Sequence, residues 1–105
     1  SLEVLEEILK RAPQAAVLHD EAYFEFCGRT AIPLIAKYPN LFVSRTFSKV
    51  YGMAALRMGG LMSQAENMAY VLKAQSPYSV NLLAALAAKV AITDQEYVAR
   101  YVKDA

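Results

Sequence analysis

Polar and ionisable side chains follow two apolar segments of this sequence, where strands are expected to end, and one more stands where a third strand is expected to begin. The six are a carboxylate, a phenol, two hydroxyls, an amine and a guanidinium: Asp20, Tyr23, Thr46, Ser48, Lys49 and Arg57. In open α/β sheets, ligands bind beyond the carboxyl ends of the strands. These side chains are therefore expected to gather in one region.

An aldehyde cofactor that carries a pyridine ring and a phosphate needs this set of groups. A lysine forms the imine, a carboxylate keeps the ring nitrogen protonated and a phenol bonds the ring oxygen, while hydroxyls and a guanidinium hold the phosphate. Each residue also has an ordinary role open to it: Lys49 as a solvated loop lysine, Asp20 as a turn cap and Tyr23 as a core aromatic. Spacing alone does not decide between the two interpretations.

The elements that must position these residues alternate between strands and helices. Short apolar runs closed by polar residues or turn chemistry predict strands at 15–18, 41–45 and 57–63, the last returning antiparallel. Apolar spacing of three and four residues predicts helices at 2–12, 30–37, 64–73, 81–92 and 93–101. The helix at 81–92 is apolar nearly all round and is expected to be buried. The pattern as a whole predicts a layered α/β architecture.

Composition narrows the class of protein. The 105 residues are 56% hydrophobic and 20% charged, with a formal net charge of +1. This indicates a packed globular core and no basic surface for nucleic acid. No apolar run is long enough to cross a membrane. The single cysteine, Cys27, has no partner for an internal disulfide and no metal-ligand spacing around it, so a cytoplasmic protein without a bound metal is expected.

Five ordered sequence blocks resemble a known family. They are Asp-Glu-Ala-Tyr at 20–23, Pro-Asn-Leu at 39–41, Thr-Phe-Ser-Lys at 46–49, Gly-Met-Ala-Ala-Leu-Arg-Met-Gly at 52–59 and Pro-Tyr-Ser-Val-Asn at 77–81. Together they are similar to consecutive landmarks of the fold-type I, class I and II aminotransferases, above all the histidinol-phosphate aminotransferase branch. The resemblance extends over the whole chain, and five blocks in order are far more specific than any one of them.

The resemblance implies a role for each candidate residue. Lys49 would form the Schiff base with pyridoxal 5′-phosphate and later move a proton between the substrate Cα and the cofactor. Asp20 would pair with the pyridinium nitrogen, and Tyr23 would hydrogen-bond the ring oxygen. The phosphate would be held by a guanidinium and by hydroxyls: Arg57, Ser48 and, as a helper, Thr46.

The family also implies a fold and a reaction. The fold would be part of the pyridoxal-phosphate transferase large domain, a three-layer αβα arrangement with a mostly parallel sheet, about three strands of it here. The parent enzyme, expected to be a homodimer, would transfer an amino group between a phosphorylated amino-acid-like substrate, histidinol phosphate, and a 2-oxo acid, 2-oxoglutarate. A threonine-phosphate decarboxylase shares much of the pattern and stays open as an alternative.

Several family features have no counterpart in this sequence. The Gly-rich phosphate turn, the Asn-Pro turn and the small C-terminal domain are absent, so residues 1–105 are expected to be a fragment of the large catalytic domain. In isolation it would self-associate and would be inactive, and a non-catalytic remnant is the second alternative. The strand bearing the Asn-Pro turn is expected between the strands that end at Asp20 and Arg45, where its absence would leave a gap. His19, the only histidine, stands in place of an apolar residue and is expected to be half-buried beside the site.

Overall fold

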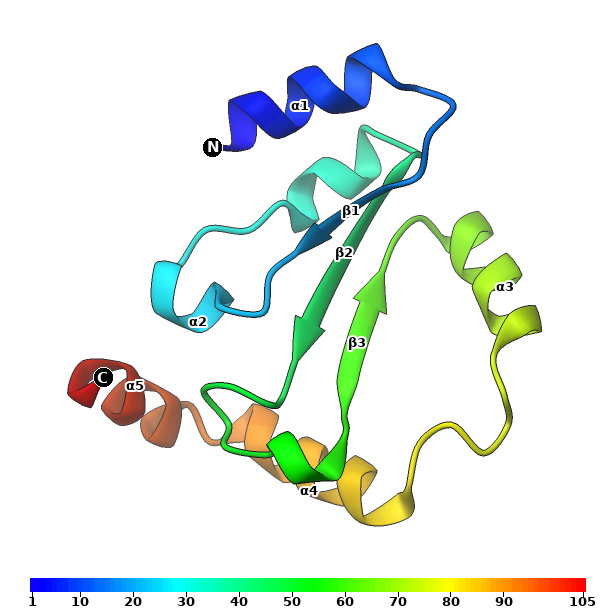
Figure 1. The fold of residues 1–105 in the computed structure, drawn as a ribbon. Helices are drawn as coiled ribbons and strands as arrows, with labels where there is room; N and C mark the ends of the chain where they lie inside the picture. The colour runs from blue at the N-terminus through cyan, green and yellow to red at the C-terminus, as the bar shows by residue number, and fades with distance from the viewer.

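Three strands and seven helical segments make up the fold in the computed structural model, which describes all of residues 1–105 (Figure 1). In chain order they are α1 (Leu2–Arg11), β1 (Val17–Asp20), α2 (Phe24–Cys27), the 3₁₀ helix η1 (Ile32–Ala36), β2 (Leu41–Thr46), the 3₁₀ helix η2 (Ala54–Leu56), β3 (Gly59–Met62), α3 (Ala65–Ala74), α4 (Leu82–Thr93) and α5 (Gln95–Asp104). The predicted α/β class with three strands is confirmed.

The strands form one mixed sheet in the order β1-β2-β3. β1 and β2 run parallel, with Asp20 opposite Ser44, and β3 returns antiparallel to β2, with Gly59 opposite Thr46. The carboxyl ends of β1 and β2 and the amino end of β3 therefore lie at one edge of the sheet. This edge is where the sequence placed the candidate residues.

The predicted gap between the strands that end at Asp20 and Arg45 is wrong. β1 and β2 are direct neighbours: the Val17 amide donates to the Asn40 carbonyl, and the Glu21 amide donates to the Ser44 carbonyl, each at 2.9 Å. Because backbone groups that face each other across this pair are already hydrogen-bonded, no strand fits between them.

The core lies between one face of the sheet and the helices α1 and η1. Leu5 and Leu9 of α1 pack against Leu41 and Val43 of β2, since residues two apart in a strand share a face. The Asn40 side-chain amide donates to the carbonyls at the end of α1, which joins that helix to the start of β2. The body measures 39 × 35 × 19 Å, and such a flat shape leaves only 10 of its residues buried.

Helix α4 corrects a second prediction. Only Ala84 and Ala88 are buried, and Leu82, Leu83 and Val90 remain between 69% and 73% exposed. Apolar residues are buried only where a neighbour covers them, and in this chain one narrow stripe of α4 is covered.

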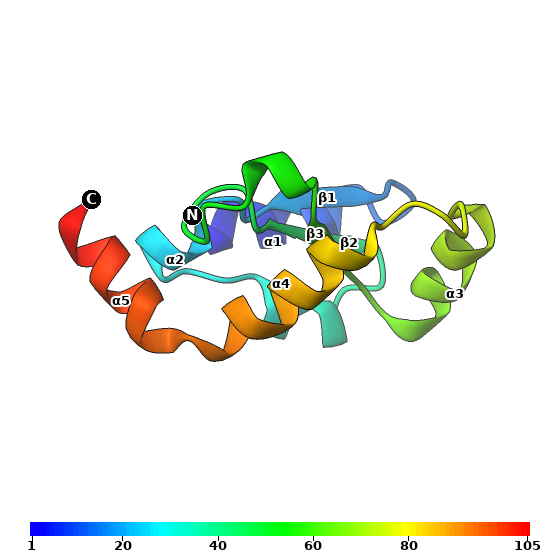
Figure 2. The same cartoon turned by 90° about the horizontal axis from the view of Figure 1, so that it is seen from below.

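The helices α3 and α5 lie at opposite ends of the molecule in both views (Figure 1 and Figure 2).

The remaining differences are local. In place of the helix predicted at 30–37, Ile32–Ala36 form the short 3₁₀ helix η1 with Pro33 at its start. β1 lies two residues later than predicted, with alternating rather than continuous burial. The last helix extends to Asp104, and Asp94 is its N-cap through a 2.9 Å bond from the Tyr97 amide. None of the helices combines the length and the apolar character needed to cross a bilayer.

Candidate active site

The carboxylate of Asp20 stands at the last residue of β1. Its Oδ1 accepts a hydrogen bond of 2.8 Å from the Ser44 hydroxyl, which lies directly opposite in the parallel register. Both side chains point away from the core face, because Val43 beside Ser44 faces the core. The Asp20 side chain is therefore exposed at the sheet edge and oriented by its neighbour.

Lys49 lies in the loop that follows β2, and its amine lies beside Tyr23. The ammonium nitrogen is 5.2 Å from the centroid of the Tyr23 ring, and Lys49 forms no salt bridge with any carboxylate. Tyr23, in the turn after β1, is 58% exposed. The structure thus brings together two of the predicted residues, 26 positions apart in the sequence, and leaves the amine accessible.

The loop that carries Lys49 is closed by backbone bonds at both ends. The Phe47 amide donates to the Met58 carbonyl at 3.2 Å, and the Met53 amide donates to the Phe47 carbonyl at 3.0 Å. Gly52 adopts φ +65°, and its amide donates to the Lys49 carbonyl at 2.9 Å. Glycine suits this left-handed position because it has no Cβ to clash. The turn sets the direction in which Lys49 leaves the sheet.

The expected phosphate ligands lie close to this loop in sequence. Thr46 ends β2, and its hydroxyl oxygen accepts the Ser48 amide at 3.1 Å. Arg57 precedes β3 and is exposed, with its guanidinium donating to the Ala54 carbonyl at 3.0 Å. It is the one residue other than glycine with positive φ, at 54°. A backbone held at positive φ by a residue other than glycine is strained, and such strain is often found at ligand sites.

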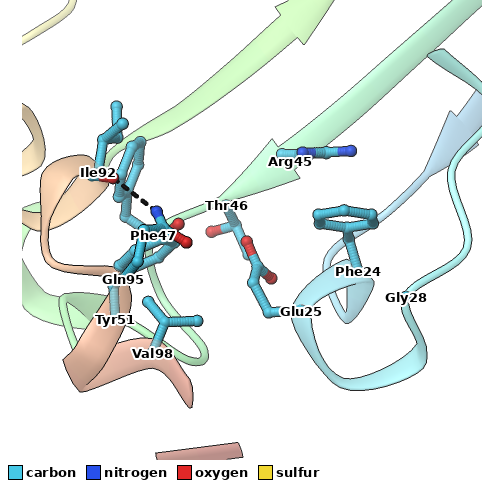
Figure 3. A pocket seen from close by; sticks show the side chains of 10 residues that line it. All are labelled: Phe24, Glu25, Gly28, Arg45, Thr46, Phe47, Tyr51, Ile92, Gln95 and Val98. Atoms are coloured by element: carbon cyan, nitrogen blue, oxygen red, sulfur yellow. Dashed lines mark hydrogen bonds between the residues drawn. The ribbon is translucent and has the colours of Figure 1, made fainter.

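The pockets do not enclose all six candidates. A pocket of about 260 Å³ is lined by Asp20 and Tyr23 together with His19. The largest pocket, about 500 Å³, lies between the α2 region, the end of β2 and α5, and of the candidates only Thr46 lines it (Figure 3). Neither is lined by Ser48, Lys49 or Arg57. The site in this chain is an open edge with two of its groups in contact, rather than a closed cavity.

Sequence reasoning missed Ser44 and a buried ionic cluster behind the site. Glu21 is buried and bonded to Arg45, and the Nε2 of half-buried His19 lies 4.0 Å from its Oε1. The parallel register would have revealed Ser44, since it places that residue opposite Asp20. Nearby, burial raises the pKa of the Tyr51 phenol above its ordinary value, with the Glu25 carboxylate adding to the effect.

The donor set at this edge fits an aldehyde cofactor with a phosphate. It offers an amine free of ion pairs in contact with a phenol, an oriented carboxylate, and hydroxyl and guanidinium donors from the loop and from the start of β3. Each class of group matches one part of such a cofactor.

Residues 1–105 match the model of the family Aminotransferase class I and II, and the chain belongs to this family. It is 42% identical over 103 residues to a histidinol-phosphate aminotransferase of Pseudomonas fluorescens, a match that covers 93% of this chain and 28% of that protein. The chain thus spans about 28% of the length of this curated relative.

Solved structures agree with this assignment. The histidinol-phosphate aminotransferase from Clostridium acetobutylicum superposes with a TM-score of 0.86 at 28% identity, over 97% of this chain and 32% of that one. The histidinol-phosphate aminotransferase from Sinorhizobium meliloti, solved with pyridoxal-5′-phosphate, gives a TM-score of 0.79 at 30% identity, over 92% of this chain and 28% of that one. The fold is that of the pyridoxal-phosphate transferases, and the cofactor of the family is pyridoxal phosphate.

Proposed function

We propose that residues 1–105 are a section of the cofactor-binding large domain of an aminotransferase, in which Lys49 binds pyridoxal phosphate. The observation that carries the proposal is the accessible Lys49 amine beside the Tyr23 ring, at the sheet edge where Asp20 ends β1. The family and the fold support it. The whole protein would transfer an amino group between histidinol phosphate and 2-oxoglutarate.

Bound pyridoxal phosphate supplies an electron sink that makes the Cα–H of an amino-acid substrate acidic. Once the substrate's amino group has replaced it on the cofactor, the Lys49 amine, which forms no salt bridge, would be free to remove that proton and return it. Asp20, oriented by the Ser44 hydroxyl, holds a proton on the pyridine nitrogen. Tyr23 donates its phenol proton to the ring oxygen, and this favours the ionised oxygen.

Phosphate binding is assigned to the loop after β2 and to the residue before β3. Arg57 supplies a fixed pair of N–H donors, which suits a phosphate better than a lysine does. Ser48 and Thr46 supply hydroxyl protons, since the bond between them uses the Thr46 oxygen as acceptor and leaves its proton available. A homodimer is part of the proposal: apolar side chains of α4, such as Leu82 and Leu83, are exposed and favour association.

The test compares two lysines in the intact gene product. Lys73 also lies over a tyrosine ring, 4.8 Å from the Tyr70 centroid, and serves as the matched control for Lys49. Wild type and Lys73→Ala, mixed with pyridoxal phosphate, should both develop the absorption band of the protein-bound cofactor, and Lys49→Ala should not. A Lys49→Ala protein that keeps the wild-type band would refute the proposal.

Product analysis separates the alternatives. Histidinol phosphate with 2-oxoglutarate should yield glutamate, whereas release of CO₂ from threonine phosphate would favour the decarboxylase. The chain 1–105 alone should show no turnover. Turnover by it would reject the view that these residues are a non-catalytic part.

A further inference from the structure

Glu21 is the only charged residue of the chain that is buried, with 5% exposure, and the proposed mechanism does not use it. It follows Asp20 directly and lies two residues before Tyr23. A buried carboxylate is costly unless it is paired and hydrogen-bonded. A structural reason for its presence must therefore be found in its contacts.

Four donors surround this carboxylate. Its Oε1 accepts the Ala31 amide at 2.6 Å, and its Oε2 accepts the Thr30 hydroxyl at 2.9 Å. Arg45 donates to Oε2 from Nε and contacts it again from Nη2, both at 3.0 Å. Nη2 also donates to the Thr30 hydroxyl oxygen at 3.0 Å. No buried side-chain polar atom of the chain lacks a partner.

Arg45 is held from a second side by an aromatic ring. Its guanidinium carbon lies 3.6 Å from the centroid of Phe24, in the first turn of α2, and both side chains line the pocket of about 500 Å³, where they lie side by side (Figure 3). The planar guanidinium suits both contacts at once, since it stacks on a ring and donates in its own plane. A lysine at this position could do only one of them.

The cluster lies behind the proposed site. Neighbouring residues in a strand point to opposite faces. Asp20 meets Ser44 on the open face, and Glu21 meets Arg45 on the core face one residue further along both strands. The Glu21 amide is also the last rung of the ladder, donating to the Ser44 carbonyl. Glu21 is thus linked to Asp20 by one peptide unit and by the two hydrogen bonds that both residues make with Ser44.

The same cluster also holds the turn that carries Tyr23. The Glu21 carbonyl accepts the Phe24 amide at 3.0 Å, which closes that turn, and the Glu21 side chain bonds Thr30 and Ala31 at the far end of the α2 loop. Two ends of one segment are therefore tied to a single residue.

We propose that Glu21 and Arg45 are positioning residues, which fix the carboxylate of Asp20 and the ring of Tyr23 from the face of the sheet opposite the cofactor. The proposal rests on the function assigned above for its purpose, although not for its geometry. It explains why a charged pair, rather than two apolar residues, stands at this place: directional bonds define a position where apolar contacts allow sliding.

Glu21→Gln tests the proposal in the intact gene product, with Glu6→Gln as its matched control. Glu6 also makes tertiary hydrogen bonds, from the Tyr38 hydroxyl at 2.5 Å and from the Lys37 amine at 3.1 Å, but it lies on α1 away from the site. Without cofactor, Glu21→Gln should speed hydrogen exchange of the Phe24 amide about tenfold. The substitution keeps the Glu21 carbonyl that this amide bonds but loses the charge-assisted bond from Arg45 that holds the residue in place. Glu6→Gln should leave that amide unchanged.

The second readout is the dissociation constant of pyridoxal phosphate. It should rise about tenfold in Glu21→Gln and stay unchanged in Glu6→Gln, by the same loss of a charge-assisted bond. A double variant, Glu21→Met with Arg45→Met, removes both charges and leaves neither unpaired. It keeps the test valid if the single variant fails to fold. It should recover thermal stability without recovering cofactor affinity or slow Phe24 exchange.

Two results would overturn the positioning role. One is a Glu21→Gln protein that matches Glu6→Gln in both exchange and affinity; the other is a stable double variant that binds pyridoxal phosphate as wild type does. If wild type itself does not bind the cofactor, the proposed function fails. The exchange rate of the Phe24 amide then decides the positioning role alone, and an unchanged rate rejects it.

Discussion

Gly59 and Gly60 offer a sharp test of how β3 is held against β2. A Cβ built on Gly59 would meet the Arg45 carbonyl oxygen at 2.9 Å, closer than real Cβ contacts, whereas one built on Gly60 meets nothing within 4 Å. The obstacle at Gly59 is backbone, which cannot rotate away as a side chain can. Gly59→Ala must therefore push the two strands apart.

The two substitutions should change the unfolding free energy differently. Overpacking of this kind costs about 1–3 kcal/mol of unfolding free energy. Gly60→Ala should be neutral or should stabilise by about 0.4–1 kcal/mol, because alanine lowers the entropy of the unfolded chain. The two variants should thus differ by at least about 1 kcal/mol, with Gly59→Ala the less stable.

Urea denaturation of both variants measures this difference as a shift of the midpoint at constant slope. Gly59→Ala should also weaken cofactor binding. The reason is that the Met58 carbonyl, beside Gly59, closes the Lys49 loop by accepting the Phe47 amide. Unfolding free energies of the two variants that agree within about 0.5 kcal/mol would refute the packing argument, because a difference that small lies within the usual scatter of such comparisons.

Three further predictions concern single side chains. Asn81→Ala should cost about 1 kcal/mol by urea denaturation, because the N-cap of α4 is lost; Asn81→Asp should keep the cap and lose only the bond to the Leu56 carbonyl. Arg57→Gly should raise the unfolding free energy by about 1 kcal/mol, by relieving its positive φ, yet lower pyridoxal-phosphate affinity by about tenfold in a spectroscopic titration. The Tyr38 hydroxyl holds the pKa of Glu6 below its usual 4.5 in the folded protein. Glu6 therefore stabilises the fold above that pH, and the contribution is lost on acidification, so Glu6→Gln should lose less stability than wild type between about pH 5 and pH 3.

The local elements follow from the sequence because their causes are local. Helical spacing predicts α1 and an apolar stripe of Leu2, Val4, Leu5, Ile8 and Leu9. Leu5 and Leu9 are buried, whereas Val4 and Ile8 are exposed. The short run from Leu41 predicts β2 to within one residue. Lys49 and Tyr23 were assigned from the order of the family's blocks, and the structure brings them into contact.

The rest depends on partners far apart in the chain. That Glu21 meets Arg45, and Asp20 meets Ser44, follows only from the register of two parallel strands 24 residues apart. The direct pairing of β1 with β2 is likewise a matter of strand order, which composition does not encode. The apolar character of α4 predicts burial, but burial requires a covering neighbour, and within these residues only a narrow stripe has one.

The most direct measurement locates the cofactor on the chain. The intact protein is incubated with pyridoxal phosphate, reduced with borohydride, digested and analysed by mass spectrometry. The account predicts a phosphopyridoxyl group on Lys49, in the loop between β2 and β3, and none on Lys73. Modification of other lysines with Lys49 unlabelled, or no stable modification at all, would contradict it.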